Sequence, residues 1–342
     1  MIWSNNSKLV KRWRYFLLQI LLVTAPIYVL MGVGFATVRL AWFSKADLQV
    51  LGRLVINVLS PALLFGALAQ QDVAGVLNVA YLLVYGLGSL LALAIAMFVS
   101  HRVRGKPLTV AALQGMGSAC SNSVFVGYPV LQPLLGPLGG VALAMTVLVE
   151  NLLVLPLCLA LADAGQGNAV SARAAVSRTL AGLVRNPMLV AIAAGFTCAL
   201  LGWHLPPMLQ KPLSMLGAAA GPVALFVVGG SLVGLTLDGL RTALAVVTTS
   251  KLVLHPLAVA GVLWAWSALV GAAGLPAGWA LDGPLSFAVV AFAAMPMLGI
   301  YPVLALKYGE VRFASAVLLV TTLASFVTLT AWLWALGLTT MN

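Results

Sequence analysis

Two ionisable side chains lie deep inside long apolar runs of this chain, Glu150 and Lys251. If both runs are membrane-crossing helices, a rise of about 1.5 Å per residue puts each charge about 14–18 Å from the nearer surface. A charge buried in lipid is costly and by default indicates an ion pathway, a partner or a substrate counter-charge. We expect Glu150 to bind a proton and Lys251 to attract an anion or pair with Glu150. The simpler alternatives are a structural hydrogen bond for Glu150 and a side chain that extends to the membrane surface for Lys251.

Two apolar runs are interrupted near their centres. Residues 115–129 are dense in glycine and small hydroxyl residues around Asn122, and residues 294–302 carry Pro296, Gly299 and Pro302. Proline removes a backbone donor and glycine tolerates irregular backbone, so both runs should be broken helices. Broken helices at matched positions indicate a binding site, where half-helix N-termini present N–H groups suited to a carboxylate. Alternatively, these residues only kink and join packed helices.

These interruptions belong to a chain that is nearly all membrane. Of its 342 residues, 62% are hydrophobic and 7% charged, whereas soluble domains carry roughly 25% charged residues. This excludes a water-soluble fold and predicts an all-α integral membrane protein of ten transmembrane helices. The expected helices lie near 15–38, 51–70, 75–99, 108–132, 137–162, 186–203, 211–236, 242–270, 284–308 and 312–338.

Other site chemistries lack the residues they need. The three histidines and three cysteines are scattered singly, so we expect no metal site, no disulfide framework and no cofactor. The acidic residues outside Glu150 fall in loops or at helix ends and none adjoins another acid, which argues against an enzyme. The net charge of +11 comes from short loops between apolar runs, which indicates membrane orientation rather than a nucleic-acid partner.

The basic residues predict how the chain sits in the lipid bilayer. Most fall in the odd-numbered connections, which places that side in the cytoplasm and both termini outside a cytoplasmic (inner) membrane. The basic segment 1–14 conflicts with this orientation. Either it lies flat on the membrane, or the natural start is further downstream.

The chain also repeats itself. At an offset of 161 residues Pro26 matches Pro187, Trp42 matches Trp203 and Pro61 matches Pro222, and at 173 residues Tyr128-Pro129 matches Tyr301-Pro302. A unit of five helices is odd in number, so the second copy is inverted, as in many secondary transporters. We therefore expect two inverted repeats, 15–163 and 186–342, joined by a cytosolic linker, 164–185.

Four segments carry further recognisable motifs, Asn57 to Phe65, Ser121 to Pro129, Lys251 to Pro256 and Ala294 to Gly309. With them the chain resembles the auxin efflux carrier family along nearly its whole length. The resemblance implies ten helices with helices four and nine broken and crossed, and a substrate class of small carboxylates. Plant members export auxin, and bacterial members include malonate and malate permeases. It also implies that Asn122 and Pro296 belong to the substrate site, with Asn57 and Pro61 as a neighbouring wall.

Together these patterns predict a secondary transporter that moves a small organic anion by alternating access, proton-coupled or as a uniporter. The alternative is an anion channel or a non-catalytic regulatory membrane subunit. The sequence is also compatible with a homodimer. The expected substrate-binding residues are Ser121, Asn122, Ser123, Gly127, Pro129, Pro296, Gly299, Ile300, Tyr301, Asn57 and Pro61, with Glu150 and Lys251 as the coupling or charge pair.

Overall fold

A computed structural model describes residues 25–26, 28–69, 78–167, 185–203, 205–234, 241–274, 276, 279–281 and 283–340. The basic segment 1–14 and most of the linker 164–185 lie outside these residues. Within the described part, all regular elements are helices, and the β structure is a single isolated bridge between Ser121 and Met297. The prediction of an all-α protein is confirmed.

Six described helices are long and apolar enough to cross a membrane. Several are continuous helices that include a short π-helical turn, here labelled η. They are Lys45–Ala69 (α2 Lys45–Leu54, η1 Val55–Leu59, α3 Ser60–Ala69), Val79–Val103 (α5 Val79–Phe98, η2 Val99–Val103), Pro137–Gly165 (α8 Pro137–Val149, η4 Glu150–Val154, α9 Leu155–Gly165), Pro207–Ser231 (α12), Thr242–Ala273 (within α13 Arg241–Thr249, η5 Ser250–Leu254, α14 His255–Ala273) and Val311–Gly337 (within α17 Val311–Thr340).

Shorter helices complete the described structure. They are Tyr28–Arg39, α6 Leu108–Ala119, η3 Ser123–Gly127, α7 Tyr128–Leu135, α11 Pro187–Leu200, α15 Gly283–Ala293 and α16 Tyr301–Leu306. Large apolar side chains such as Trp264 and Val327 are mostly exposed, at 76% and 69%, as expected where a helix faces lipid. The chain is therefore a multi-pass membrane protein.

One helix begins earlier than the hydropathy predicts. The helix expected from residue 51 starts at Lys45, because Ser44 and Asp47 form a capping box. The Ser44 hydroxyl accepts from the Asp47 N–H at 3.2 Å, and the Asp47 carboxylate accepts from the Ser44 N–H at 2.8 Å. Satisfying these end groups extends the helix into a polar stretch that an apolar window does not detect.

Four of the π-helical turns stand just before a proline. The turns η1, η3, η4 and η5 end two residues before Pro61, Pro129, Pro156 and Pro256 respectively. A proline within a helix lacks its N–H and clashes with the preceding turn, and a wider turn relieves that clash. Such turns recur at functional sites, and here Glu150 and Lys251 each lie in one.

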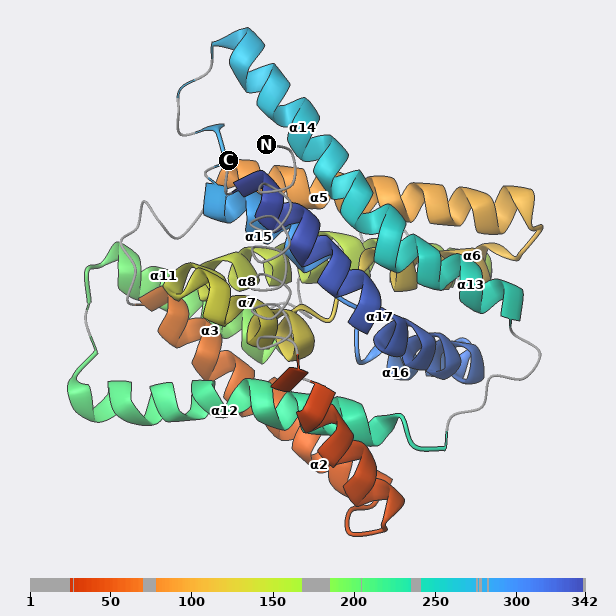
Figure 1. Ribbon diagram of the computed structural model, residues 1–342, viewed down its shortest axis with the longest axis horizontal. Coiled ribbons are helices and arrows are strands. Elements are labelled where there is room, and N and C mark those ends of the chain that lie inside the picture. Colours follow the sequence, from red (N-terminus) through yellow and green to blue (C-terminus); the bar gives the residue numbers. More distant parts are fainter. Residues whose placement is uncertain are drawn as a thin grey trace, which may run out of the picture.

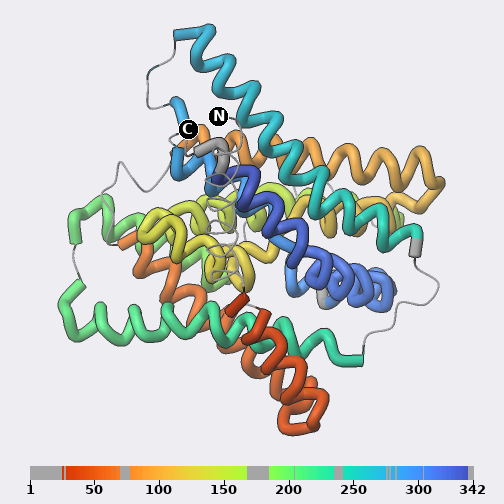
Figure 2. The backbone as a smooth tube through the Cα atoms, viewed as in Figure 1, coloured from red at the N-terminus to blue at the C-terminus, as the bar shows by residue number. Residues whose placement is uncertain are grey.

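The helices pack in two groups. In the first, α11 and α12 both pack on α3, and α2 packs on α12. In the second, α5 packs on α6 and α14, and α15 packs on α8. Figure 1 shows α2 and α12 along one edge of the molecule, with α5 and α14 on the opposite side and α7, α8 and α15 between them. The same arrangement is visible in the tube of Figure 2. The two groups meet where α3 packs on α8 and where α12 packs on η3 and α7.

Glycines allow the closest helix contacts in the first group. A methyl group at Gly34 would collide with the backbone of Phe226 in α12, and one at Gly229 would collide with the backbone of Met31. Small residues at helix interfaces let backbones approach closely, which is how membrane helices gain packing energy. The helix Tyr28–Arg39 is thus fixed against α12.

Candidate functional site

Two helices are interrupted, and the interruptions meet. The first runs from α6, which ends at Ala119, to η3, which begins at Ser123; the second runs from α15, which ends at Ala293, to α16, which begins at Tyr301. Their extended backbones pair in an antiparallel way. The Asn122 N–H donates to the Pro296 carbonyl at 2.8 Å, and the Leu298 N–H donates to the Cys120 carbonyl at 3.2 Å. These bonds satisfy part of the backbone that both helices leave unpaired.

Other donors at this crossing remain unpaired. Among the described residues, the N–H groups of Ser123, Val124 and Phe125 have no protein acceptor, because they form the first turn of η3. The side-chain amide nitrogen of Asn122, a residue only 2% exposed, also lacks a partner. A half-helix N-terminus carries a partial positive charge. The arrangement therefore offers several buried donors to an anion.

The carboxylate of Glu150 is buried beside this N-terminus. It accepts from the Ser121 N–H at 2.8 Å and from the Tyr85 hydroxyl at 2.9 Å, and the Ser123 hydroxyl donates to it at 3.2 Å. The η4 turn brings Glu150 to this place from the neighbouring helix. Glu150 is 3% exposed, so its hydrogen bonds replace the water that a charged carboxylate would otherwise need.

The ammonium group of Lys251 lies on the other side of Ser121. It donates to the Ser121 hydroxyl, to the Ala293 carbonyl and to Nδ1 of His255, each at 2.8 Å. An ammonium has three hydrogens, so all of them are used. Since Nδ1 of His255 accepts, Nε2 carries the ring proton and donates to the Ser89 hydroxyl at 2.9 Å.

Glu150 and Lys251 are thus joined through Ser121. Within the described chain they form no direct ion pair; Ser121 instead donates its backbone N–H to the acid and accepts from the base through its hydroxyl. The described residues also contain no cluster of three histidine, cysteine or acidic side chains that could bind a metal ion.

A cavity of about 120 Å³ opens at the crossing, and we call it the crossing cavity. Of the residues expected from the sequence, it brings together Ser121, Asn122, Ser123, Gly299, Ile300 and Glu150. Its remaining lining residues are Ile56, Val124, Phe125, Val147, Asn151, Leu155, Asn186, Met188 and Leu298. Gly299 leaves space beside Asn122, because a methyl group there would lie 3.3 Å from the amide nitrogen.

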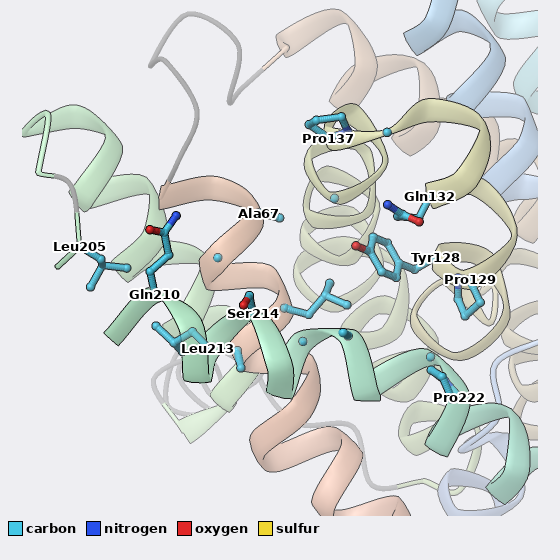
Figure 3. Close-up of a pocket in the computed structure, with 18 residues that line it drawn as sticks. Ala67, Tyr128, Pro129, Gln132, Pro137, Leu205, Gln210, Leu213, Ser214 and Pro222 are labelled. Carbon is cyan, nitrogen blue, oxygen red and sulfur yellow. The ribbon is translucent and has the colours of Figure 1, made fainter. Parts of the chain in front are cut away.

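A larger cavity of about 590 Å³ lies between α3 and α12 on one side and α7 and α8 on the other. We call it the wide cavity. Figure 3 shows Tyr128 and Gln132 on one side and Gln210 and Ser214 on the other. Pro129 lines it and stands close to Gly221, where an added methyl would lie 2.9 Å from the proline ring. The η3–α7 segment therefore borders both cavities.

The other expected residues have different positions. Tyr301 is buried and donates from its hydroxyl to the Leu113 carbonyl at 2.9 Å, which ties α16 to α6. Gly127 packs against the ring of Phe292, and Pro296 contributes its carbonyl to the crossing. Asn57 is exposed, and neither it nor Pro61 lines the two cavities. Ile56, which lies in η1 beside Asn57, lines the crossing cavity instead.

Sequence reasoning missed several polar residues at the site. Asn151 follows Glu150 directly, and Asn186 precedes Pro187 in a typical helix start. His255 is four residues after Lys251 and so shares its helix face. Tyr85 carries no local signal that links it to Glu150.

Two comparisons with known proteins bear on what this site does. Residues 20–333 match the family described as "Membrane transport protein". The chain belongs to this family. This confirms the resemblance to the auxin efflux carriers. A protein of Rhizobium meliloti (strain 1021) named "Putative malonate transporter" is 25% identical over 313 residues, which cover 90% of this chain and 93% of that protein.

Proposed function

We propose that this membrane transport protein is a secondary transporter that carries a small carboxylate through the crossing cavity. The observation that carries this proposal is the set of unpaired donors there, the N–H groups of Ser123 to Phe125 and the side-chain amide of Asn122. Backbone donors at a helix N-terminus bind anions without any cationic side chain. The name of the Rhizobium relative supports a dicarboxylate such as malonate as the first substrate to test.

We further propose ten transmembrane helices in two inverted repeats. After each break the chain carries a Tyr-Pro step, Tyr128-Pro129 at the start of α7 and Tyr301-Pro302 at the start of α16. Counting each broken pair as one crossing and adding Tyr28–Arg39 and α11 to the six long helices gives ten. Two inverted halves that meet at a central site suit alternating access.

The proposed orientation places the cationic connections in the cytoplasm, with both termini outside the cytoplasmic membrane. These connections meet in pairs: the Lys307 ammonium is 2.6 Å from the Asp163 carboxylate, and the Lys45 ammonium stands beside Gly234. Loops on one side of the membrane carry the excess of lysine and arginine in such proteins.

Glu150 suggests how transport is coupled. Its carboxylate lies at the same half-helix N-terminus that would bind the substrate anion. Two negative groups in one small buried site repel each other. A proton on Glu150 would remove this repulsion, so we propose that proton and carboxylate move together. Lys251 has no hydrogen left for the substrate, and we assign it to holding the two breaks in place.

The proposal is tested by uptake into liposomes. The purified protein should take up labelled malonate with saturable kinetics, and unlabelled malonate inside should drive counterflow. Flux that neither saturates nor responds to internal malonate would indicate a channel instead. If a panel of mono- and dicarboxylates gives neither uptake nor thermal stabilisation, the assignment to anions fails.

Asn122→Ala tests the site itself. Loss of one buried hydrogen bond to a charged guest should weaken malonate binding about tenfold or more. Asn78→Ala is the matched control, because Asn78 caps α5 by accepting from the Tyr81 N–H and lines neither cavity. Equal affinities for wild type and Asn122→Ala would remove Asn122 from the site.

A further inference from the structure

Two asparagines lie side by side in the wall of the crossing cavity. Asn186 donates from its side-chain amide to the side-chain carbonyl of Asn151 at 3.3 Å, and both side chains are half-buried and line the cavity. In the described chain this is the hydrogen bond that links the start of α11 to the η4 turn. Asn151 also donates to the Val147 carbonyl at 2.9 Å, which fixes its amide within its own helix.

Asn186 is held firmly and still has donor capacity. Its side-chain oxygen accepts from the Met188 N–H at 3.0 Å and so caps α11. Its amide nitrogen has two hydrogens, and only the one bonded to Asn151 has an acceptor among the described residues. The bond to Asn151 joins neutral groups at a long distance, so an anionic guest could replace it at small cost.

The donors of the cavity therefore come from two directions. Asn122 and the η3 amides belong to the broken helix, whereas Asn186 enters from α11, which packs on α3 and η1 in the other group. Arg185, which is exposed, stands next to Asn186 and adds positive charge on that side. A guest with a single carboxylate can use only one of these donor sets, and one with two carboxylates can use both.

We propose that Asn186 binds the second carboxylate of a short dicarboxylate and so sets the preference for dicarboxylates over monocarboxylates. This rests on the proposed function, since the first carboxylate occupies the η3 amides. Asn186 acts as a specificity-determining residue. When the bound molecule is a monocarboxylate with a methyl group in place of the second carboxylate, the side-chain N–H of Asn186 has no charged partner, and this disfavours the monocarboxylate.

The test compares malonate with propionate, which has a methyl group in place of one carboxylate. Binding of each to the purified full-length protein is measured by titration calorimetry. The variant is Asn186→Ser, which keeps a capping oxygen but loses the amide donor. Asn78→Ser makes the same change at the cap of α5, outside the site. A second variant, Asn186→Asp, keeps the cap and adds a negative charge.

We expect wild type and Asn78→Ser to prefer malonate. Asn186→Ser should weaken malonate binding about tenfold to hundredfold and leave propionate binding unchanged, and Asn186→Asp should weaken malonate further. Equal losses for both ligands, or an unchanged ratio, would overturn the role of Asn186 while the carboxylate site stands. A wild-type protein that binds malonate and propionate equally would do the same. Binding of neither ligand to wild type would overturn the proposed function along with it.

Discussion

Replacing Lys251 by Met should destabilise the protein more than any other single change at the crossing. The ammonium is fully buried and has three acceptors at 2.8 Å, of which the Ala293 carbonyl ends α15 and the Ser121 hydroxyl belongs to the other break. Methionine fills a similar volume but donates nothing. The variant would leave these acceptors unsatisfied and Glu150 without a nearby cation.

The expected size follows from that geometry. Hydrogen bonds to a charged group contribute about 1.5–3 kcal/mol each, but the ammonium also loses its hydration on burial, which offsets much of the sum. Removing one member of a buried charge pair typically costs about 3–5 kcal/mol, and we expect a loss in that range. The free energy of unfolding can be measured in mixed detergent micelles by titration with SDS, followed by tryptophan fluorescence.

A double-mutant cycle separates charge from packing. Glu150→Gln keeps the shape of the side chain and an oxygen that can accept from Ser121 and Tyr85. If Ser121 couples the two charges, the double variant should be more stable than the sum of the single losses predicts, by about 1–3 kcal/mol. Additive losses, or a loss below about 1 kcal/mol for Lys251→Met alone, would refute the view that Lys251 holds the two breaks together.

Two further predictions concern coupling and packing. At a fixed concentration of the malonate dianion, uptake by the wild-type protein should rise as the pH falls. The Glu150→Gln variant should transport malonate at a rate that does not depend on pH. A pH response retained in that variant would assign Glu150 a structural role. Gly34→Ala should reduce the thermal stability and the yield of folded protein, because the added methyl collides with the Phe226 backbone. Gly32→Ala is the control on the same helix: nothing lies within 4 Å of the added methyl, so the change should be neutral or slightly stabilising. Equal thermal stability of the two variants would contradict this prediction.

The sequence predicts the class of fold well because lipid imposes simple rules on it. The apolar runs predict where the helices lie, and the glycines and prolines around Asn122 and Pro296 predict where two of them break. The ends of helices are harder, as Lys45 shows, because a capping box depends on two polar residues. The exact face of a helix is also hard to predict: the sequence indicates Asn57 at the site, whereas its neighbour Ile56 lines the cavity.

Partners that are distant in sequence could not be predicted. Glu150 and Lys251 were expected near the same depth, but nothing local shows that Ser121 stands between them. Asn186 reads as an ordinary helix cap, and only the packing of α11 on α3 and η1 brings it to the cavity. The prolines that follow Glu150 and Lys251 are the local signal for these turns, since each charged residue lies in a π turn that ends two residues before a proline.

Unpaired donors gather at one cavity of the crossing, and this favours a bound anion. Lys251 and the paired backbones take up the carbonyls of Cys120, Ala293 and Pro296. The unpaired donors of Ser123 to Phe125 and of Asn122 border one cavity. An unpaired buried donor costs about 1–3 kcal/mol. Asn122, Ser123 and Phe125 are buried and Val124 is half-buried, so these donors together are a penalty unless water or a guest binds them. A purely structural kink does not require these donors to line one cavity, whereas a site that binds and releases a carboxylate does.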